Sequence, residues 1–203
     1  CEIAPSTSAN FVMFYQNQTL IPNGTYTLIQ NTEGEIVVPS ELDRNVFLGL
    51  PDYNRNEVEH LQFLGGFTHE FGSGLKLEGQ AGYSNTDSQA QSVYTYNYFP
   101  ATLYAGVYNR SYERAIETYD AELRFGGDFE LFGRNHKFLV NAEYRKIQRD
   151  DPRYAYVYLG FVDQFDPDFS FVDTSAPGFE SPLAGFTKEE RENFGIGGQL
   201  LLN

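Results

Sequence analysis

The stretch FGGDFELFGRNHKFLVNAEY, residues 125–144, contains two runs of alternating apolar and polar residues joined by a tight turn. The first run begins before this stretch, at Asp120. Its odd-numbered positions carry the apolar residues Ala121, Leu123, Phe125, Phe129 and Leu131, and its even-numbered positions carry the charged residues Asp120, Glu122, Arg124, Asp128 and Glu130. In the second run the even-numbered positions carry His136, Phe138, Val140, Ala142 and Tyr144, and the odd-numbered positions carry the polar residues Lys137, Asn141, Glu143 and Arg145. Successive side chains of a strand point to opposite faces, so we expect each strand to have one face in an apolar medium and one in water.

Long strands with a strongly charged polar face and a very short turn are typical of an outer-membrane β-barrel, with lipid outside and a polar lumen inside. The chain of 203 residues is 41% hydrophobic and 16% aromatic, with 15 Tyr and 18 Phe, which suits strands and the aromatic girdles of membrane interfaces. It has no run of about 18 apolar residues, so we expect no transmembrane helix. Strands cross a bilayer without such a run because only alternate residues face lipid.

Charge and cysteine content exclude other classes of protein. The net charge is −14, so phosphate would be repelled and we expect no nucleic-acid partner. Cys1 is the single cysteine, which excludes an internal disulfide framework and a cysteine-based metal cluster. A cysteine in this position is either the acylated residue of a lipoprotein or a residue within a longer protein. We favour the second reading, because nothing else in the sequence points to a lipid-anchored domain.

The sequence predicts about six strands separated by links of alternating length. Short turns lie at residues 72–74 and 132–135, whereas the links at about 20–56, 85–109 and 151–187 are long. Outer-membrane barrels have short periplasmic turns and long extracellular loops, so we assign the two sets of links to those two sides. The predicted fold class is therefore all-β: antiparallel transmembrane strands of an outer-membrane β-barrel, with residues 1–203 forming part of the barrel domain and no plug domain.

Six strands are too few for a typical barrel, and open sheet edges do not occur in lipid. The final residues, GGQLLLN, also lack the aromatic residue that commonly ends barrel proteins. Barrels whose lumen holds a separate plug reach about 22 strands. We therefore expect the chain to be a partial barrel and a piece of something larger.

Three stretches carry a resemblance to a known family. The first is GGDFELFGRNHKFLVNAEYR, residues 126–145, with a turn pattern formed by Gly127, Phe129, Leu131, Gly133, Arg134, His136, Glu143 and Tyr144. The others are VFLGLPDYN, residues 46–54, and FTHEF, residues 67–71, before a glycine-rich turn. In this order and spacing they resemble the barrel of TonB-dependent siderophore receptors of the ferrichrome-receptor type. Asn141 stands where the family pattern has glycine, which leaves the strand alternation intact.

The resemblance implies an outer-membrane receptor of a Gram-negative bacterium that binds a ferric siderophore outside the cell and transports it through the barrel. Energy would come from the TonB complex, acting through a plug domain that lies upstream in the family and is absent from this chain. The other implied partner is outer-membrane lipid. The resemblance implies no cofactor, with the ferric siderophore as the transported ligand, and no enzyme activity.

The residues themselves show no convincing catalytic or metal-binding arrangement. The three histidines, His60, His69 and His136, lie on different expected strands. Neither a Gly-x-Ser-x-Gly nor a His-Glu-x-x-His motif occurs. We therefore predict neither catalytic residues nor a metal site.

Aromatic residues in the long links are the candidates for ligand binding. The first set, near residue 95, lies at even-numbered positions like Lys76, Glu78 and Gln80, so in a strand without a bulge it faces the lumen. It also lies too far along the strand to belong to a lipid-facing aromatic girdle. The facing of the second set is left open by Pro152. Tyrosine offers a ferric chelate a stacking face and a hydroxyl donor, although packing within the extracellular loops is the alternative. The candidate residues are Tyr94, Tyr96 and Tyr98 in the first set and Tyr154, Tyr156 and Phe161 in the second, which also contains Tyr158.

Two rival functions remain open at the level of sequence. One is a complete small outer-membrane barrel that acts as an adhesin or structural protein. The other is a lipid-anchored, β-rich binding domain with its lipid on Cys1.

Overall fold

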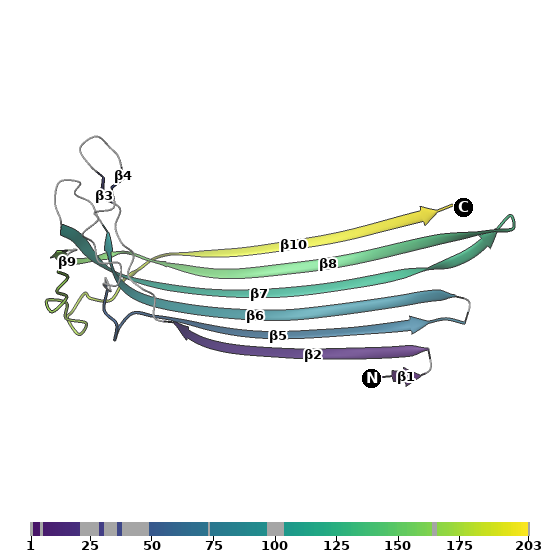
Figure 1. The fold of residues 1–203 in the computed structure, drawn as a ribbon, viewed down its shortest axis with the longest axis horizontal. Helices are drawn as coiled ribbons and strands as arrows, with labels where there is room; N and C mark the ends of the chain where they lie inside the picture. Colours follow the sequence, from purple (N-terminus) through teal and green to yellow (C-terminus); the bar gives the residue numbers. More distant parts are fainter. Residues whose placement is uncertain are drawn as a thin grey trace.

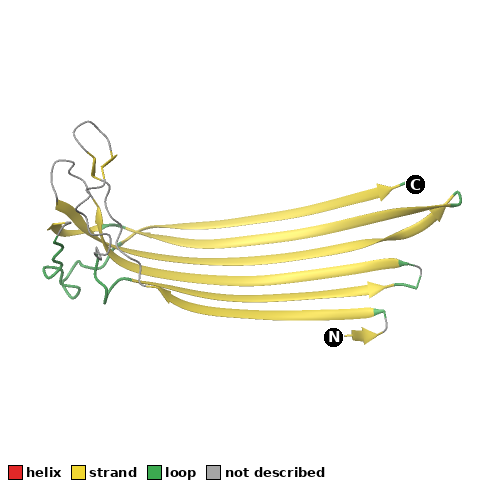
Figure 2. Ribbon diagram, in the orientation of Figure 1, coloured by secondary structure: helices red, strands yellow, loops and turns green. Residues whose placement is uncertain are grey.

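The computed structural model describes residues 2–4, 6–20, 29–30, 36–37, 49–72, 74–96, 104–163 and 166–202. Regular structure in these ranges consists of β-strands, drawn in yellow in Figure 2. The strands are β1 (Glu2–Ala4), β2 (Thr7–Leu20), β3 (Ile29–Gln30), β4 (Ile36–Val37), β5 (Arg55–Glu70), β6 (Leu75–Tyr96), β7 (Tyr104–Leu131), β8 (Arg134–Tyr154), β9 (Val157–Asp163) and β10 (Leu183–Leu201). No helix in these ranges is long and apolar enough to cross a membrane.

Most strands form one antiparallel sheet in which neighbours in space are also neighbours along the chain. The order is β1-β2-β5-β6-β7-β8-β10, with β9 also paired to β7, and β3 and β4 pair separately. Figure 1 shows the long strands side by side, with β1 and β2 at one edge and β10 at the other. The sheet is not closed, as expected of a partial barrel. The predicted all-β, antiparallel architecture is confirmed.

The two short turns have the geometry of hairpins. Between β7 and β8, Phe132 and Gly133 both have positive φ, 54° and 73°, as a two-residue turn that follows the strand twist requires. Between β5 and β6, the backbone N–H of Phe71 donates to the carbonyl of Leu75 (2.8 Å), and Gly74 has φ 80°. Both turns therefore lie at the same end of the sheet, as Figure 1 shows.

The long strands extend further than the sequence predicted. Strand β6 continues to Tyr96 and β7 begins at Tyr104, so residues 85–96 and 104–109 are strand and not loop. In the expected 151–187 loop, residues 151–154 end β8, 157–163 form β9, and 183–187 begin β10. These upper parts of the strands carry polar residues on both faces, so the period of two that marks a half-buried strand is missing from their sequence.

One face of the sheet is apolar over a limited height. We call it the outer face and its opposite the inner face, after the expected lipid and lumen sides. Aromatic rings on the outer face contact one another across four strands: Phe11 to Phe63 (6.1 Å), Phe63 to Tyr83 (6.4 Å) and Tyr83 to Tyr119 (5.0 Å). On β7 this face is apolar from Tyr119 to Leu131, roughly 40 Å of strand, or roughly 28 Å of height at a 45° tilt. That height is close to the apolar band of about 25 Å that outer-membrane barrels present to lipid.

The inner face is polar along the same height. Between the neighbouring strands β6 and β7, the Gln80 amide donates to Glu122 (2.7 Å), and within β6 Lys76 pairs with Glu78 (2.6 Å). Arg124 also pairs with Glu122, two residues away on the same strand. Neighbouring charges therefore satisfy one another on a face exposed to water, which is the arrangement that the alternation predicted.

A small packed core lies at the end of the sheet away from the short turns. The segment 166–182 folds over the outer face there, and its Phe179 packs with Val93 of β6, Val107 of β7 and Val162 of β9. The amide of Asn109 is fully buried, donates to the Phe179 carbonyl (2.6 Å) and accepts from the Tyr53 hydroxyl (3.3 Å). The core therefore fixes the upper strands without covering their inner face.

Candidate ligand-binding site

Strands β8 and β9 form one nearly continuous partner of β7. Strand β8 pairs with β7 up to Asp150, opposite Ala115, and β9 resumes the pairing at Val157, opposite Asn109. Residues 155 and 156 lie in the break between them, where the Ala155 N–H donates to the Pro182 carbonyl (2.9 Å). This break brings Tyr156 onto the inner face, beside residues of β6 and β7.

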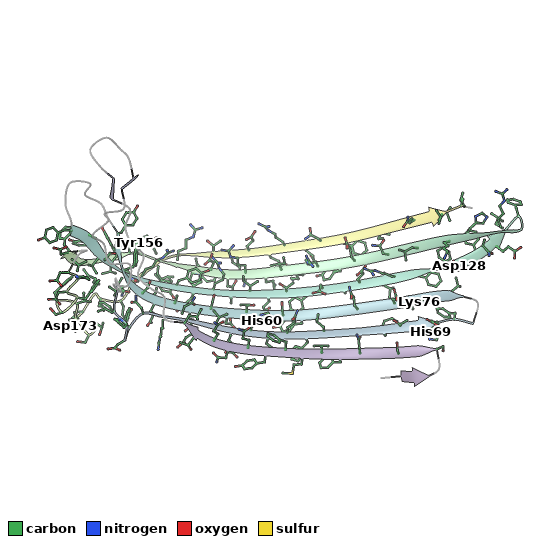
Figure 3. All side chains as sticks on the ribbon, viewed as in Figure 1. His60, His69, Lys76, Asp128, Tyr156 and Asp173 are labelled. Atoms are coloured by element: carbon green, nitrogen blue, oxygen red, sulfur yellow. The ribbon has the colours of Figure 1, made fainter. Side chains whose placement is uncertain are left out.

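Five aromatic rings gather at this point, and we call them the tyrosine cluster: Tyr94, Tyr108, Tyr156, Tyr158 and Phe161. The ring centroid of Tyr94 lies 6.2 Å from that of Tyr108 and 6.3 Å from that of Tyr156. Tyr158 joins the cluster through Tyr108 (5.4 Å) and Phe161 (5.4 Å). Figure 3 shows Tyr156 at the end of the sheet opposite Lys76 and Asp128, which lie toward the short turns.

The register places the tyrosine cluster on the inner face. Strand β6 pairs with β7 without interruption from Leu75 to Tyr96, so Tyr94 lies on the same face as Lys76 and Glu78. Tyr94 and Tyr108 are half-buried, whereas Tyr156 is 57%, Tyr158 48% and Phe161 50% exposed. The cluster therefore offers aromatic surface to a molecule on the lumen side.

One guanidinium group lies next to the tyrosine cluster, and two more lie further along the same face. The Arg110 guanidinium stacks over the Tyr156 ring at 5.0 Å, and that of Arg114 over the Tyr112 ring at 4.8 Å. Arg114 and Arg149 both bind the same Asp151 oxygen, at 3.3 and 2.5 Å. Burial alone would raise the pKa of Asp151, but the hydrogen bond from Arg149 and the charge of Arg114 outweigh it and hold the pKa below its usual value.

The phenol of Tyr94 stays neutral at physiological pH. Its burial, together with the neighbouring phenols, raises its pKa to about 12, although the charge of Arg110 acts in the opposite direction. Burial also raises the pKa of Tyr158. A neutral phenol is a hydrogen-bond donor and a stacking surface, whereas an iron ligand of this type would have to be a phenolate. The cluster therefore presents stacking surfaces and neutral hydroxyl donors.

The architecture around this site is shared with solved structures. No protein-family model and no curated protein matches the sequence. The ferripyoverdine receptor of the outer membrane of Pseudomonas aeruginosa superposes with a TM-score of 0.73 at 15% identity, over 98% of this chain and 26% of that one. The ferric-catecholate import receptor Fiu of Escherichia coli K12 superposes with a TM-score of 0.71 at 11% identity, over 96% of this chain and 29% of that receptor. The ferric preacinetobactin receptor BauA of Acinetobacter baumannii superposes with a TM-score of 0.71 at 15% identity, over 97% of this chain and 29% of that receptor.

The chain has the fold of part of an outer-membrane β-barrel. It spans about a quarter of the length of the ferripyoverdine receptor. At 11–16% identity the likeness shows the fold alone, and what those receptors bind is a property of those proteins. They are transport receptors and not enzymes.

The structure brings together some of the residues that the sequence singled out. Tyr94, Tyr156 and Phe161 belong to the tyrosine cluster, and Tyr96 lies on the same face as Tyr94 and is 55% exposed. Tyr98 lies outside the described residues. Whether these residues bind a ligand stays a prediction.

Tyr154 lies on the other face. It lines an outward-facing cavity of about 370 Å³ together with Tyr53, Glu113 and Glu180. Its burial and its hydrogen bond to Glu113 raise its pKa. Because it cannot reach the tyrosine cluster through the sheet, Tyr154 is no part of the inner site.

Sequence reasoning missed Tyr108 and Arg110, whereas Tyr158 belongs to the second aromatic set. Tyr108 and Arg110 fall at the boundary of the predicted loop 85–109, where the sequence assigns no face. The repeated spacing of two in Tyr94-x-Tyr96 and Tyr156-x-Tyr158 was the available signal that strands continue into these segments.

Proposed function

We propose that this chain forms part of an outer-membrane receptor that binds a ferric siderophore outside the cell and imports it with energy from the TonB complex. The observation that carries the proposal is the position of the tyrosine cluster. It lies on the inner face, beyond the apolar band and at the end of the sheet opposite the short turns. In a barrel with periplasmic turns, this is the extracellular mouth.

The remaining parts of the receptor follow from this placement. Lipid would cover the outer face, and further strands would pair with the edges at β1 and β10, because open edges are not tolerated in lipid. A plug domain outside this chain would fill the lumen and contact TonB. The resemblance to the ferrichrome-receptor type supports this arrangement, as do the neighbours with the same fold, which are named as siderophore or ferric-chelate receptors.

Iron uptake by whole cells tests the proposal. Under iron limitation, deletion of the gene should abolish uptake of radioactive iron supplied as a ferric catecholate or a ferric hydroxamate complex, and the intact gene should restore it. A protonophore should stop uptake but leave binding at the cell surface, because transport and not binding needs energy. Unchanged uptake of every complex in the deletion strain would contradict the proposed function.

Accessibility of introduced cysteines tests the orientation separately. Gly72→Cys and Phe132→Cys lie in the short turns and should resist a membrane-impermeant thiol reagent applied to whole cells. Ser175→Cys lies in the segment 166–182 over the outer face at the other end of the sheet and should be labelled readily. Equal labelling of the turns and of position 175 would show that the proposed orientation is wrong.

A further inference from the structure

We propose that the chelate bound at the tyrosine cluster is anionic, and that Arg110, Arg114 and Arg149, on the same inner face, hold its negative charge. This inference rests on the proposed function, and it narrows the cargo to one charge class. Two features support it: the distribution of charge between the two faces of the upper strands, and the incomplete neutralisation of Arg114 and Arg149.

Charges are sorted between the two faces of the strands above the apolar band. On the inner face, arginines outnumber carboxylates: Arg110, Arg114, Arg149, Arg153 and Arg191 against Asp151, Asp163 and Glu189. On the outer face, carboxylates outnumber cations. The cations there are Arg55, Lys146 and Lys188, and the carboxylates are Glu57, Glu59, Asp87, Glu113, Glu117, Asp150, Glu190 and Glu192. The chain as a whole has a net charge of −14, so a cationic surface at this place runs against its composition.

Two arginines between the tyrosine cluster and the apolar band, Arg114 and Arg149, keep an excess of positive charge. Arg114 and Arg149 share the single carboxylate of Asp151, whose side chain is only 16% exposed, against 32% and 35% for the two arginines. The Nε atoms of both arginines are buried and, among the described residues, donate no hydrogen bond. Two cations around one shielded anion leave a net positive group that faces the lumen.

Arg110 connects this charge to the aromatic surface. It is exposed, stacks over Tyr156, and forms no ion pair with a described residue. A guanidinium stacked on an aromatic ring is held in place while its donors remain available to an anion. A small ligand can therefore contact the Tyr156 ring and Arg110 at the same time, and the charge of Arg114 and Arg149 lies four to six residues, roughly 13–20 Å, further along the same face.

A ferric tris-catecholate complex has the matching chemistry. Three dianionic catecholates around one ferric ion leave a trianionic complex whose outer surface is made of flat aromatic rings. These rings can stack on the tyrosine cluster, and the charge can pair with the arginines. A ferric tris-hydroxamate complex is neutral, so it would gain nothing from the arginines.

Binding of the two complexes to outer-membrane vesicles from cells that express the native gene tests the inference. The protein should bind the ferric tris-catecholate more tightly than the ferric tris-hydroxamate, and added salt should weaken only the first. The double variant Arg110→Gln/Arg149→Gln should lose about tenfold or more in affinity for the trianionic complex and keep its affinity for the neutral one.

The matched control is Arg55→Gln/Lys188→Gln, which removes the same charge from the outer face and should change neither affinity. Arg149→Lys keeps the charge and should retain most of the binding, and heat-modifiable mobility of the barrel should be the same in all variants. Equal binding of both complexes, or unchanged binding of the trianionic complex by the double variant, would overturn the inference and leave the proposed function standing. If neither complex is bound or imported, the proposed function fails as well.

Discussion

Replacement of Val140 by arginine should destabilise the assembled barrel by about 2–4 kcal/mol. Val140 lies on the outer face of β8, opposite Phe125 of β7, and is 47% exposed. The apolar residues of β8 extend from His136 to Tyr144, so position 140 is near the middle of the apolar band. An arginine at that depth meets hydrocarbon and is too far from either interface for its guanidinium to reach water.

Two sets of controls make this prediction specific. Asn141→Arg and Glu130→Arg place the same side chain on the inner face, where it meets water, and should cost much less. Phe129→Arg stays on the outer face but lies close to the turn at Phe132 and Gly133, so its guanidinium can reach the interface and the cost should fall to about 0–1 kcal/mol. Urea unfolding of the protein folded into lipid vesicles measures all four. Equal losses from both faces would mean that the sheet does not separate lipid from water.

Replacement of Tyr94, Tyr156 and Tyr158 by alanine should lower the affinity for the bound chelate by roughly a hundredfold. Each ring offers a stacking contact of about 1 kcal/mol, and three such contacts correspond to about two powers of ten in Kd. Assembly of the barrel should be unaffected, because all three residues lie beyond the apolar band and are not part of the core around Val93 and Phe179. Binding to outer-membrane vesicles measures the effect.

The control for this variant is Tyr154→Ala, which removes an aromatic ring of the same kind from the outer-facing cavity. Its affinity for the chelate should equal that of the wild type. Tyr94→Phe separates the two roles of the phenol, since it retains the ring and removes the hydroxyl donor. A triple variant that assembles normally and binds as tightly as the wild type would return these tyrosines to the alternative of loop packing.

The sequence predicted the parts of the fold in which one strand face is apolar. Between Tyr119 and Tyr144, the alternation assigned most side chains to a face, and the register agrees with these assignments, although the apolar Leu139 lies on the inner face. Beyond Tyr83, residues such as Asn85, Thr86 and Asp87 are polar on both faces, so composition no longer distinguishes a strand from a loop. Their strand is maintained by hydrogen bonds to β5 and β7, which are a property of the whole sheet.

The candidate site was predictable only in part, because it depends on register. Tyr94 was assigned to the inner face correctly because β6 has no bulge. Tyr156 could not be assigned, since its position depends on the break between β8 and β9 and on the contact of Ala155 with Pro182. The separation of Tyr154 from Tyr156, two residues apart yet on opposite faces, follows from the same break.

The segment 166–182 covers the outer face of the upper strands, and the tyrosine cluster lies on the inner face of those same strands. In a receptor on a cell surface, antibodies, bacteriophages and bacteriocins meet the outward segment first. Substitutions at its exposed positions can change what these agents recognise while the residues that touch the nutrient stay the same. Variation among strains should therefore concentrate in 166–182, outside its core residues Phe169, Val172 and Phe179.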